Sequence, residues 1–284
     1  MVKLKLITIA VLSSTIQLIA QNTYELNEEY SINKNGLITL NTNDANISIT
    51  GSERENVHIE IYRKVETVGA GSDEEFEIKI EERNGNLFIR ELRKSEINYW
   101  IGYRNIDYRI KLEVPSTVKM VISEDDGDLS ISNISGDLDI NCEDGDLELN
   151  NISARKLNID IEDGDVEMNK ISGFLSLQSE DGDIEANNCS FSKIDLDTED
   201  GDVNIESSLA KDSEYKLETE DGDIKFYISG SGAKLNLNCE DGNISVEGDF
   251  NELINKEGQR QIEFGDKSAL VYLNTEDGDI KVSR

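Results

Sequence analysis

The chain has 284 residues, and its 60 acidic residues against 28 lysines and arginines give a net charge of -32. A surface this acidic excludes a typical nucleic-acid-binding protein, which needs basic residues to displace counterions from phosphates. A hydrophobic fraction of 37 % still supplies enough apolar side chains for a folded core.

Residues 1–20 predict a secretory signal peptide. Lys3 and Lys5 precede an apolar run from Leu6 to Leu12, and polar residues follow it. The run is shorter than the roughly 20 apolar residues of a membrane span. We therefore expect an exported protein in the periplasm, at the cell surface or outside the cell, with no transmembrane segment in the mature chain.

Residues 21–114 predict a β-rich N-terminal region that caps the first repeat of the chain. Within it, EFEIKIEERNGNLFIRELRK (residues 75–94) alternates apolar and polar residues on both sides of Asn-Gly, which predicts a β-hairpin. His58, the single histidine, lies in the alternating segment VHIEI. No nucleophile motif accompanies it, so we interpret His58 as an ordinary strand residue.

An aromatic segment near the end of this region has two interpretations. Tyr99, Trp100 and Tyr103 lie in INYWIGYRNIDY, between pairs of basic residues. Aromatic rings beside arginines can form a platform that binds a sugar or a protein. Large rings are also ordinary core material, in which case the segment packs as a cap. The sequence leaves both interpretations open.

Residues 115–284 are dominated by one repeated motif, Asp-Gly-Asp preceded by Glu or Asp. Its glycines are Gly127, Gly145, Gly164, Gly182, Gly201, Gly222 and Gly278, with Asp-Gly-Asn at Gly242. Successive spacings are 18, 19, 18, 19, 21, 20 and 36 residues. The last spacing is close to two periods, so a degenerate copy or an excursion lies between residues 248 and 270. A period of this length is typical of stacked-repeat proteins.

Apolar residues alternate on both sides of each motif. Leu138, Ile140 and Cys142 precede one glycine, and Leu147 and Leu149 follow it. Period two indicates strands with one buried face. The sequence therefore predicts an all-β chain whose residues 115–284 form a parallel β-solenoid. Each copy of about 18–21 residues is one coil, stacked about 4.8 Å above the previous copy in the chain.

Turn chemistry explains the motif itself. A sharp corner between short strands requires a residue that tolerates positive φ, and glycine is the usual choice. Aspartates beside it tolerate turn conformations and can accept hydrogen bonds from nearby amides.

The repeat region resembles a known family. The segments IKLEVP (residues 110–115) and VKMVISEDDGDLSISNISGDLDINCEDGDLELNNIS are similar to the putative-adhesin family of exported bacterial domains of unknown function. The resemblance extends over about residues 36–284, with an early degenerate copy at NTNDANISIT. It implies a β-solenoid of Gly-Asp-Ile/Leu repeats and a role in adhesion, and it implies no catalytic residues.

The three cysteines are predicted to be structural. Cys142 and Cys239 occupy the same inward position of their coils, and Cys189 replaces an inward isoleucine. Stacking in chain order separates Cys142 from Cys239 by five coils, far beyond the reach of a disulfide. We therefore expect three free, buried thiols.

The repeated acids suggest one cofactor. Rows of carboxylates with turn carbonyls suit a hard cation, so we hypothesise weak, multi-site calcium binding; the alternative is a solvated stripe screened by salt. The candidate ligands are Asp144, Asp146, Asp163, Asp165, Asp181, Asp183, Asp200, Asp202, Asp221 and Asp223.

The function predicted from these features is non-enzymatic. Every coil carries the same acids, whereas an active site needs a few groups in unequal environments. We expect an adhesin-like or envelope-interaction protein whose rigid acidic surface contacts a cell-envelope or extracellular protein or glycan. The alternatives are a polysaccharide-active enzyme on a β-helix and a periplasmic accessory of envelope-stress signalling.

Overall fold

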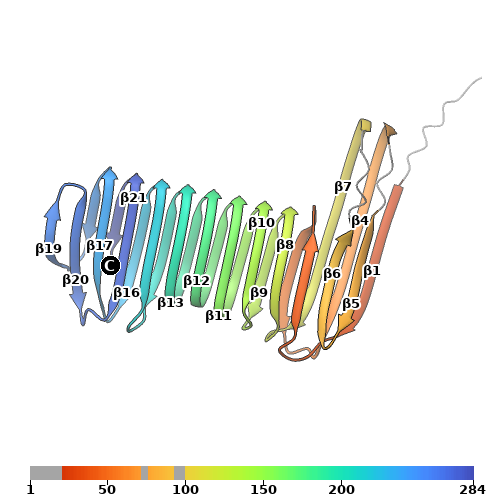
Figure 1. Ribbon diagram of the computed structural model, residues 1–284, viewed down its shortest axis with the longest axis horizontal. Helices are drawn as coiled ribbons and strands as arrows, with labels where there is room; N and C mark the ends of the chain where they lie inside the picture. The colour runs from red at the N-terminus through yellow and green to blue at the C-terminus, as the bar shows by residue number, and fades with distance from the viewer. Residues whose placement is uncertain (1–20, 72–75, 93–99) are drawn as a thin grey trace, which may run out of the picture.

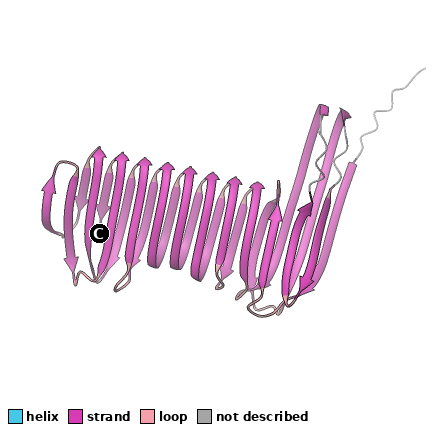
Figure 2. Ribbon diagram, viewed as in Figure 1, coloured by secondary structure: helices cyan, strands magenta, loops and turns pink. Residues whose placement is uncertain are grey.

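The computed structural model describes residues 21–71, 76–92 and 100–284, and all regular structure in these ranges is β-strand (Figure 1; Figure 2). The strands form two faces that enclose one core, so the predicted all-β solenoid is confirmed. None of the described residues forms a helix long and apolar enough to cross a membrane.

Each coil contributes one strand to each face. Face A contains, in spatial order, β5 (Glu77–Arg83), β6 (Asn86–Leu92), β2 (Leu37–Thr42), β8 (Lys119–Asp126), β10 (Leu138–Asp144), the second halves of β11 (Leu147–Asp163), β12 (Val166–Asp181) and β13 (Ile184–Asp200), then β15 (Glu214–Asp221), β21 (Ala269–Asp277), β17 (Gly232–Asp241), β20 (Gln259–Gly265) and β19 (Asn251–Lys256). Face B contains β1 (Gln21–Ser31), β4 (Asn56–Gly71), β7 (Trp100–Pro115), β3 (Asn46–Ser52), β9 (Leu129–Ile134), the first halves of β11, β12 and β13, then β14 (Val203–Leu209), β16 (Ile224–Gly230), β22 (Ile280–Ser283) and β18 (Ile244–Glu247).

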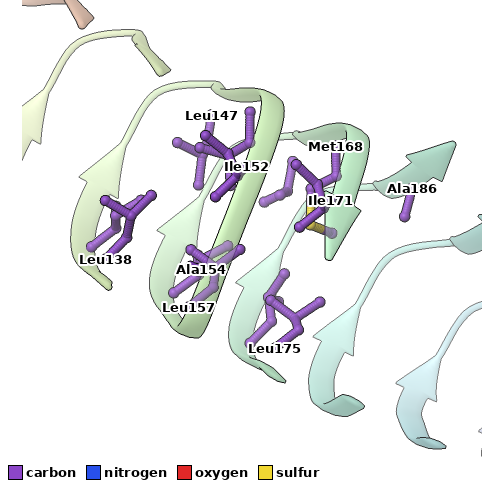
Figure 3. Packing of buried hydrophobic residues seen from close by; sticks show 14 of the residues in the cluster. Leu138, Leu147, Ile152, Ala154, Leu157, Met168, Ile171, Leu175 and Ala186 are labelled. Carbon is purple, nitrogen blue, oxygen red and sulfur yellow. The ribbon is translucent and has the colours of Figure 1, made fainter. Parts of the chain in front are cut away.

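The core lies between the two faces and is built from columns of equivalent residues. Ile140, Ile159, Leu177 and Leu196 pair from strand to strand on face A, and all four are buried. Figure 3 shows another such column close up: Leu138, Leu157 and Leu175 of face A lie across the core from apolar side chains of face B such as Leu147 and Ile171. The polar residues alternate with these buried residues along each strand, so the polar side chains point outward into solvent.

The turn glycines are required for two reasons. Seven of the eight have φ between 117° and 157°, which confirms the predicted need for positive φ. The turns also stack closely: a Cβ on Gly164 would lie 2.2 Å from the Gly145 carbonyl oxygen, and one on Gly278 would lie 2.1 Å from that of Gly222. No larger residue fits between such turns, which turn chemistry alone does not reveal.

The order of the last coils differs from the expected chain order. β21 pairs with β15 on one side and with β17 on the other, and β22 lies between β16 and β18 in the same way. The C-terminal coil is thus inserted between two coils that are consecutive in sequence. The expected excursion is the antiparallel pair β19–β20, which packs on β17. This insertion places Cys142 and Cys239 six strands apart on face A, rather than the predicted five.

The N-terminal region contributes strands of its own to both faces. β2 and β3 form a coil that pairs with β8 and β9, so the degenerate early copy is part of the stack. The predicted hairpin is confirmed as β5–β6, with Asn84 and Gly85 at positive φ in its turn. β4 and β7 pair antiparallel over their length and extend with β1 beyond the solenoid (Figure 1). A boundary at residue 114 stays a prediction.

Candidate functional site

The candidate site is the corner where face A strands turn into face B strands, which we call the acidic corner. It consists of the Glu/Asp-Asp-Gly-Asp tetrads and the Glu240–Asn243 tetrad, and it carries 23 acidic residues. Parallel pairing in register aligns the tetrads into three columns along one edge. The candidate calcium ligands lie in the two aspartate columns: Asp144, Asp163, Asp181, Asp200 and Asp221 before the glycine, and Asp146, Asp165, Asp183, Asp202 and Asp223 after it.

The aspartates after the glycine form a hydrogen-bonded ladder. The Asp165 N–H donates to Asp146 Oδ1 at 3.1 Å, and the Asp183 N–H donates to Asp165 Oδ1 at 2.9 Å. The same contact recurs in spatial order at every step, with distances of 2.8–3.3 Å: Asp146 to Asp128, Asp202 to Asp183, Asp223 to Asp202, Asp279 to Asp223 and Asn243 to Asp279. At the other end the Asp128 N–H donates to Asn46 Oδ1 at 3.1 Å. Each aspartate therefore holds the next turn, and a neutral asparagine ends the ladder on both sides.

The aspartates before the glycine use their backbone carbonyls in the stack. The Gly145 N–H donates to the Asp163 carbonyl at 3.1 Å, and the Gly222 N–H donates to that of Asp277 at 2.9 Å. These turn carbonyls therefore already accept a hydrogen bond. Among the residues that the structure describes, no group of three or more His, Cys, Asp or Glu side chains is arranged to hold a metal ion. Calcium binding stays a prediction.

The third column of the acidic corner is a row of glutamates that face solvent. Partial desolvation by the neighbouring turns, followed by the charges of Glu180 and Glu143, raises the pKa of Glu162. The charges of Glu276 and Glu199 are the main cause of the raised pKa of Glu220. Neighbouring coils therefore repel one another along this edge. The partners of Glu220 also reflect the spatial order of the coils, because Glu276 belongs to the inserted C-terminal coil.

Glu124 is an acid inside the core that the repeat pattern did not predict. It is fully buried at the inward position that Cys142 holds in the next coil. Its Oε1 accepts a hydrogen bond from the Ala45 N–H at 3.2 Å, whereas its Oε2 and the Oγ1 of neighbouring Thr42 are buried without a partner in the described structure. Burial raises the pKa of Glu124 to about 9, so the carboxyl is protonated at neutral pH. The sequence did contain a signal for this buried acid. Glu124 stands three residues before its turn glycine, where the other coils carry an apolar residue, a cysteine or a hydroxyl-bearing residue.

The three cysteines face inward, as predicted. Cys142, Cys189 and Cys239 are buried and free. The Cys239 thiol donates to the Gly278 carbonyl at 3.1 Å, and the hydroxyl of Thr275 at the same position donates to the Gly222 carbonyl at 3.1 Å. Burial raises the pKa of Cys142 to about 12 and that of Cys189 to about 11, which makes both thiols poor nucleophiles.

The structure places two of the aromatic candidates, Trp100 and Tyr103, at the far end of the β4–β7 arm. Tyr99 lies outside the described residues, and Trp100 is the first residue of β7. Tyr103 is 58 % exposed, so it does not pack as a cap. Tyr108, further along β7, is buried against Phe76 with ring centroids 5.4 Å apart. The structure therefore shows core packing for Tyr108, while the platform stays a prediction for Tyr99, Trp100 and Tyr103.

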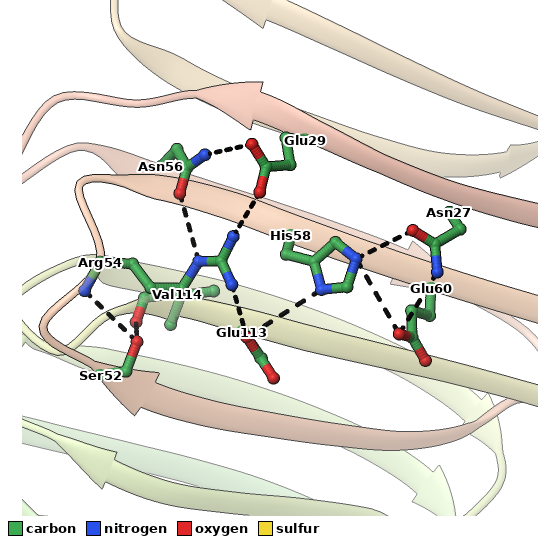
Figure 4. Close-up of polar contacts among 9 residues, drawn as sticks. All are labelled: Asn27, Glu29, Ser52, Arg54, Asn56, His58, Glu60, Glu113 and Val114. Carbon is green, nitrogen blue, oxygen red and sulfur yellow. Dashed lines mark hydrogen bonds and ion pairs between the residues drawn. The ribbon is translucent and has the colours of Figure 1, made fainter.

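His58 belongs to a polar network on the outer side of face B (Figure 4). Its Nε2 lies 3.1 Å from Asn27 Oδ1, and the carboxylates of Glu60 and Glu113 lie 3.9 and 4.0 Å from the ring nitrogens. Arg54 ties β1 to β7 nearby through ion pairs with Glu29 at 2.9 Å and with Glu113 at 2.5 Å. These contacts hold neighbouring strands together, in keeping with an ordinary strand residue.

Comparison with known proteins supports the same family as the repeats. Residues 5–283 match the Toastrack DUF4097 family, nearly the whole chain. The chain belongs to this family. No curated protein matches the sequence. The resemblance inferred from the Gly-Asp-Ile/Leu repeats is therefore confirmed at the level of family and fold, and the Toastrack family has no assigned function.

The solved structures that this chain resembles are distant in sequence. A putative adhesin from Bacteroides fragilis NCTC 9343 is 15 % identical, with a TM-score of 0.53 over 91 % of this Toastrack chain and 97 % of the other. Two proteins of Parabacteroides distasonis ATCC 8503, described as a putative adhesin and a putative lipid binding protein, are 10 % and 16 % identical with TM-scores of 0.47 and 0.48. The match with the putative adhesin covers 93 % of this chain and 98 % of the other. The match with the putative lipid binding protein covers 92 % and 96 %. At this identity the first likeness shows the fold alone.

Proposed function

We propose that this Toastrack protein is a non-enzymatic exported protein that presents the acidic corner as a rigid, repetitive surface for adhesion or another contact in the cell envelope. The observation that carries the proposal is the aspartate ladder. Its backbone N–H groups donate to the preceding side-chain oxygen at 2.8–3.3 Å at every step along the corner. It fixes each turn relative to the next, so carboxylates recur at one spacing, about 4.8 Å. The description of the Bacteroides fragilis structure as a putative adhesin supports the word adhesion.

The uniformity of the corner favours binding over catalysis. Acid catalysis needs two carboxyl groups whose environments push their pKa values apart. Here successive coils repeat the same ladder contact and the same outward glutamate. A partner with repeated groups can contact several coils at once, and such multivalent binding gains strength from many individually weak contacts.

The test compares capture of envelope components by three immobilised proteins: the native chain, a corner variant and a matched control. The corner variant is Glu143→Gln, Glu162→Gln and Glu180→Gln; the control removes three outward carboxylates of face A by Asp139→Asn, Asp160→Asn and Asp197→Asn. We expect the native chain and the control to retain the same envelope protein or glycan, and the corner variant to lose it. Equal capture by all three rejects the corner as the contact surface.

A parallel screen against acidic and neutral glycans separates the binding function from catalysis. Retention without cleavage agrees with the proposal. Turnover of any glycan rejects it and favours the polysaccharide-active enzyme. Capture of an envelope-stress signalling component by the native chain and by the corner variant alike would favour the periplasmic accessory.

A further inference from the structure

The outer part of β7 has an open edge. β4 pairs with β7 from Trp100 to Glu113, whereas β3 pairs with β7 only from Arg109 onward. Beside residues 100–108, no described strand lies on the β3 side of β7, and this part of the strand stands clear of the solenoid (Figure 1). In an antiparallel pair, every second residue directs its N–H and C=O away from the partner strand. The open side of β7 therefore presents backbone groups with which another strand can pair.

The other edge strands of the two faces are protected against such pairing. Proteins protect their sheet edges with charged residues or with very short strands. β1 carries three glutamates, β5 carries five charged residues among its seven, and β18 is only four residues long. By contrast, residues 101–106 of β7 (IGYRNI) contain a single charged residue, and Ile101 and Tyr103 are 75 % and 58 % exposed. An unprotected edge with exposed apolar side chains is typical of a site that binds a partner.

The open edge leads into a groove on the outer side of face B. The groove has a volume of about 430 Å³ and crosses β7, β3, β9, β11 and β12. In one row across these strands, Lys111 is followed by Ser48 and Ser130, and Glu148 is next. The short serine side chains leave a hollow between the two longer ones. A strand added beside residues 101–106 would lie in line with β3, so its end would meet this groove.

The charges of the groove favour a basic occupant. Five acidic and two basic residues line it: Asp128, Asp146, Glu148, Asp165 and Glu167, with Arg109 and Lys111. Arg109 already pairs with Asp107 at 2.9 Å. Glu148 and Glu167 are exposed, and neither forms an ion pair within the described ranges of the chain. A lysine or arginine side chain that enters the groove therefore finds carboxylates that no internal cation neutralises.

We propose that the open edge of β7 binds an extended segment of a partner protein, which adds to the sheet as a strand and places a basic side chain in the groove. Hydrogen bonds between main chains hold such a segment, and contacts to alternate side chains give specificity. Ile101 and Tyr103 supply these contacts, because they lie an even number of residues from Arg109 and so share the outer side of β7 with the groove. The inference goes beyond the proposed function and does not use the outward glutamates of the acidic corner.

Peptide binding by the full mature chain tests the proposal. The probe is a fluorescent peptide of alternating threonine and valine with two lysines at each end, followed by fluorescence anisotropy at about 0.15 M salt. The edge variant, Ile101→Ser with Tyr103→Ser, loses the apolar contacts and should bind the peptide about tenfold more weakly. The groove variant, Glu148→Gln with Glu167→Gln, loses two ion pairs and should bind about fivefold more weakly. A peptide methylated on every threonine and valine nitrogen lacks the N–H donors and should not bind.

Two matched control variants should bind the peptide like the native chain. Leu270→Ser with Tyr272→Ser removes another exposed apolar pair, from β21, and Glu185→Gln with Glu206→Gln removes two outward carboxylates of face B outside the groove. Circular dichroism checks that every variant is folded. The proposal is overturned if the native chain does not bind the peptide, if the methylated peptide binds equally well, or if a control loses as much binding as its counterpart. Self-association of the native chain that the edge variant loses also overturns it, in favour of a second copy on this edge.

Discussion

Thr275 lies directly between Thr219 and Cys239 on face A, although Cys239 precedes it in the chain by 36 residues. The arrangement arises because β17 does not pair with β15. The chain instead continues through β19 and β20, which packs antiparallel on the outer side of β17. Its last coil then returns to occupy the place between β15 and β17. As a result, β15 and β17 are each paired on both sides, which satisfies their backbone N–H and C=O groups.

Gly164→Ala should destabilise the protein strongly. Gly164 has φ 142°, and its new Cβ would lie 2.2 Å from the carbonyl oxygen of Gly145, which is backbone and cannot rotate away. We expect a loss of about 3 kcal/mol in the free energy of unfolding, measured by urea denaturation. The reverse exchange Lys170→Gly is the control. Lys170 has φ 57° and is exposed, so glycine there should leave stability equal or higher. Equal effects of the two exchanges would contradict the close stacking of turns.

The aspartate ladder predicts different outcomes for Asp165→Asn and Asp165→Ala. Asparagine keeps a side-chain oxygen for the Asp183 N–H, as Asn46 does for Asp128 at the end of the ladder. It also removes one of the repelling charges, so its urea midpoint should match or exceed that of the native chain. Alanine removes the acceptor and should cost about 1 kcal/mol. Identical midpoints for the two variants would mean that the ladder contributes nothing to stability.

Glu124 should dominate the dependence of stability on pH. Its pKa is raised from 4.5 to about 9 by burial, so between these values the folded chain binds a proton that the unfolded chain has released. Stability should therefore fall as the pH rises, by about 2–3 kcal/mol between about pH 5 and 7. Glu162 and Glu220, whose pKa values are also raised, act in the same direction.

The Glu124→Gln variant isolates this contribution. It keeps an oxygen for the Ala45 N–H and cannot ionise, so its melting temperature should depend much less on pH. Thermal unfolding of both proteins in low-salt buffers across this range is the measurement. If the two melting curves shift in parallel with pH, Glu124 is not the controlling group.

The calcium hypothesis predicts a specific stabilisation. Calcium should raise the melting temperature more than magnesium at matched ionic strength, because rows of carboxylates suit its larger and more flexible coordination sphere. The excess should vanish in the variant Asp144→Asn, Asp163→Asn and Asp181→Asn, which keeps the backbone contacts of the turns. Equal shifts from the two salts would leave only screening, and the hypothesis would be rejected.

Local rules predicted most of one coil. Alternation placed Ile140 and Cys142 inside, and turn chemistry placed glycine at the corner, because both depend on a few neighbouring residues. The spatial order of the last coils could not be predicted in this way, because tetrads with the same pattern can stack in any order. Only the β19–β20 pair, which occupies the outer side of β17, sets the last coils apart from the others. The aspartate ladder was not predicted either. Its hydrogen bonds form between coils and become visible only when equivalent positions are aligned in space.

Disulfide trapping in the folded protein tests the stacking order most directly. Neighbouring parallel strands place Thr275 about 4.8 Å from Cys239, within disulfide range, whereas Thr219 is two strands away at about 10 Å. After mild oxidation, mass spectrometry of the unreduced T275C variant should show a disulfide from Cys239 to the introduced thiol, and T219C should show none. A disulfide in T219C and its absence in T275C would mean that the coils stack in chain order, which would contradict the inserted C-terminal coil.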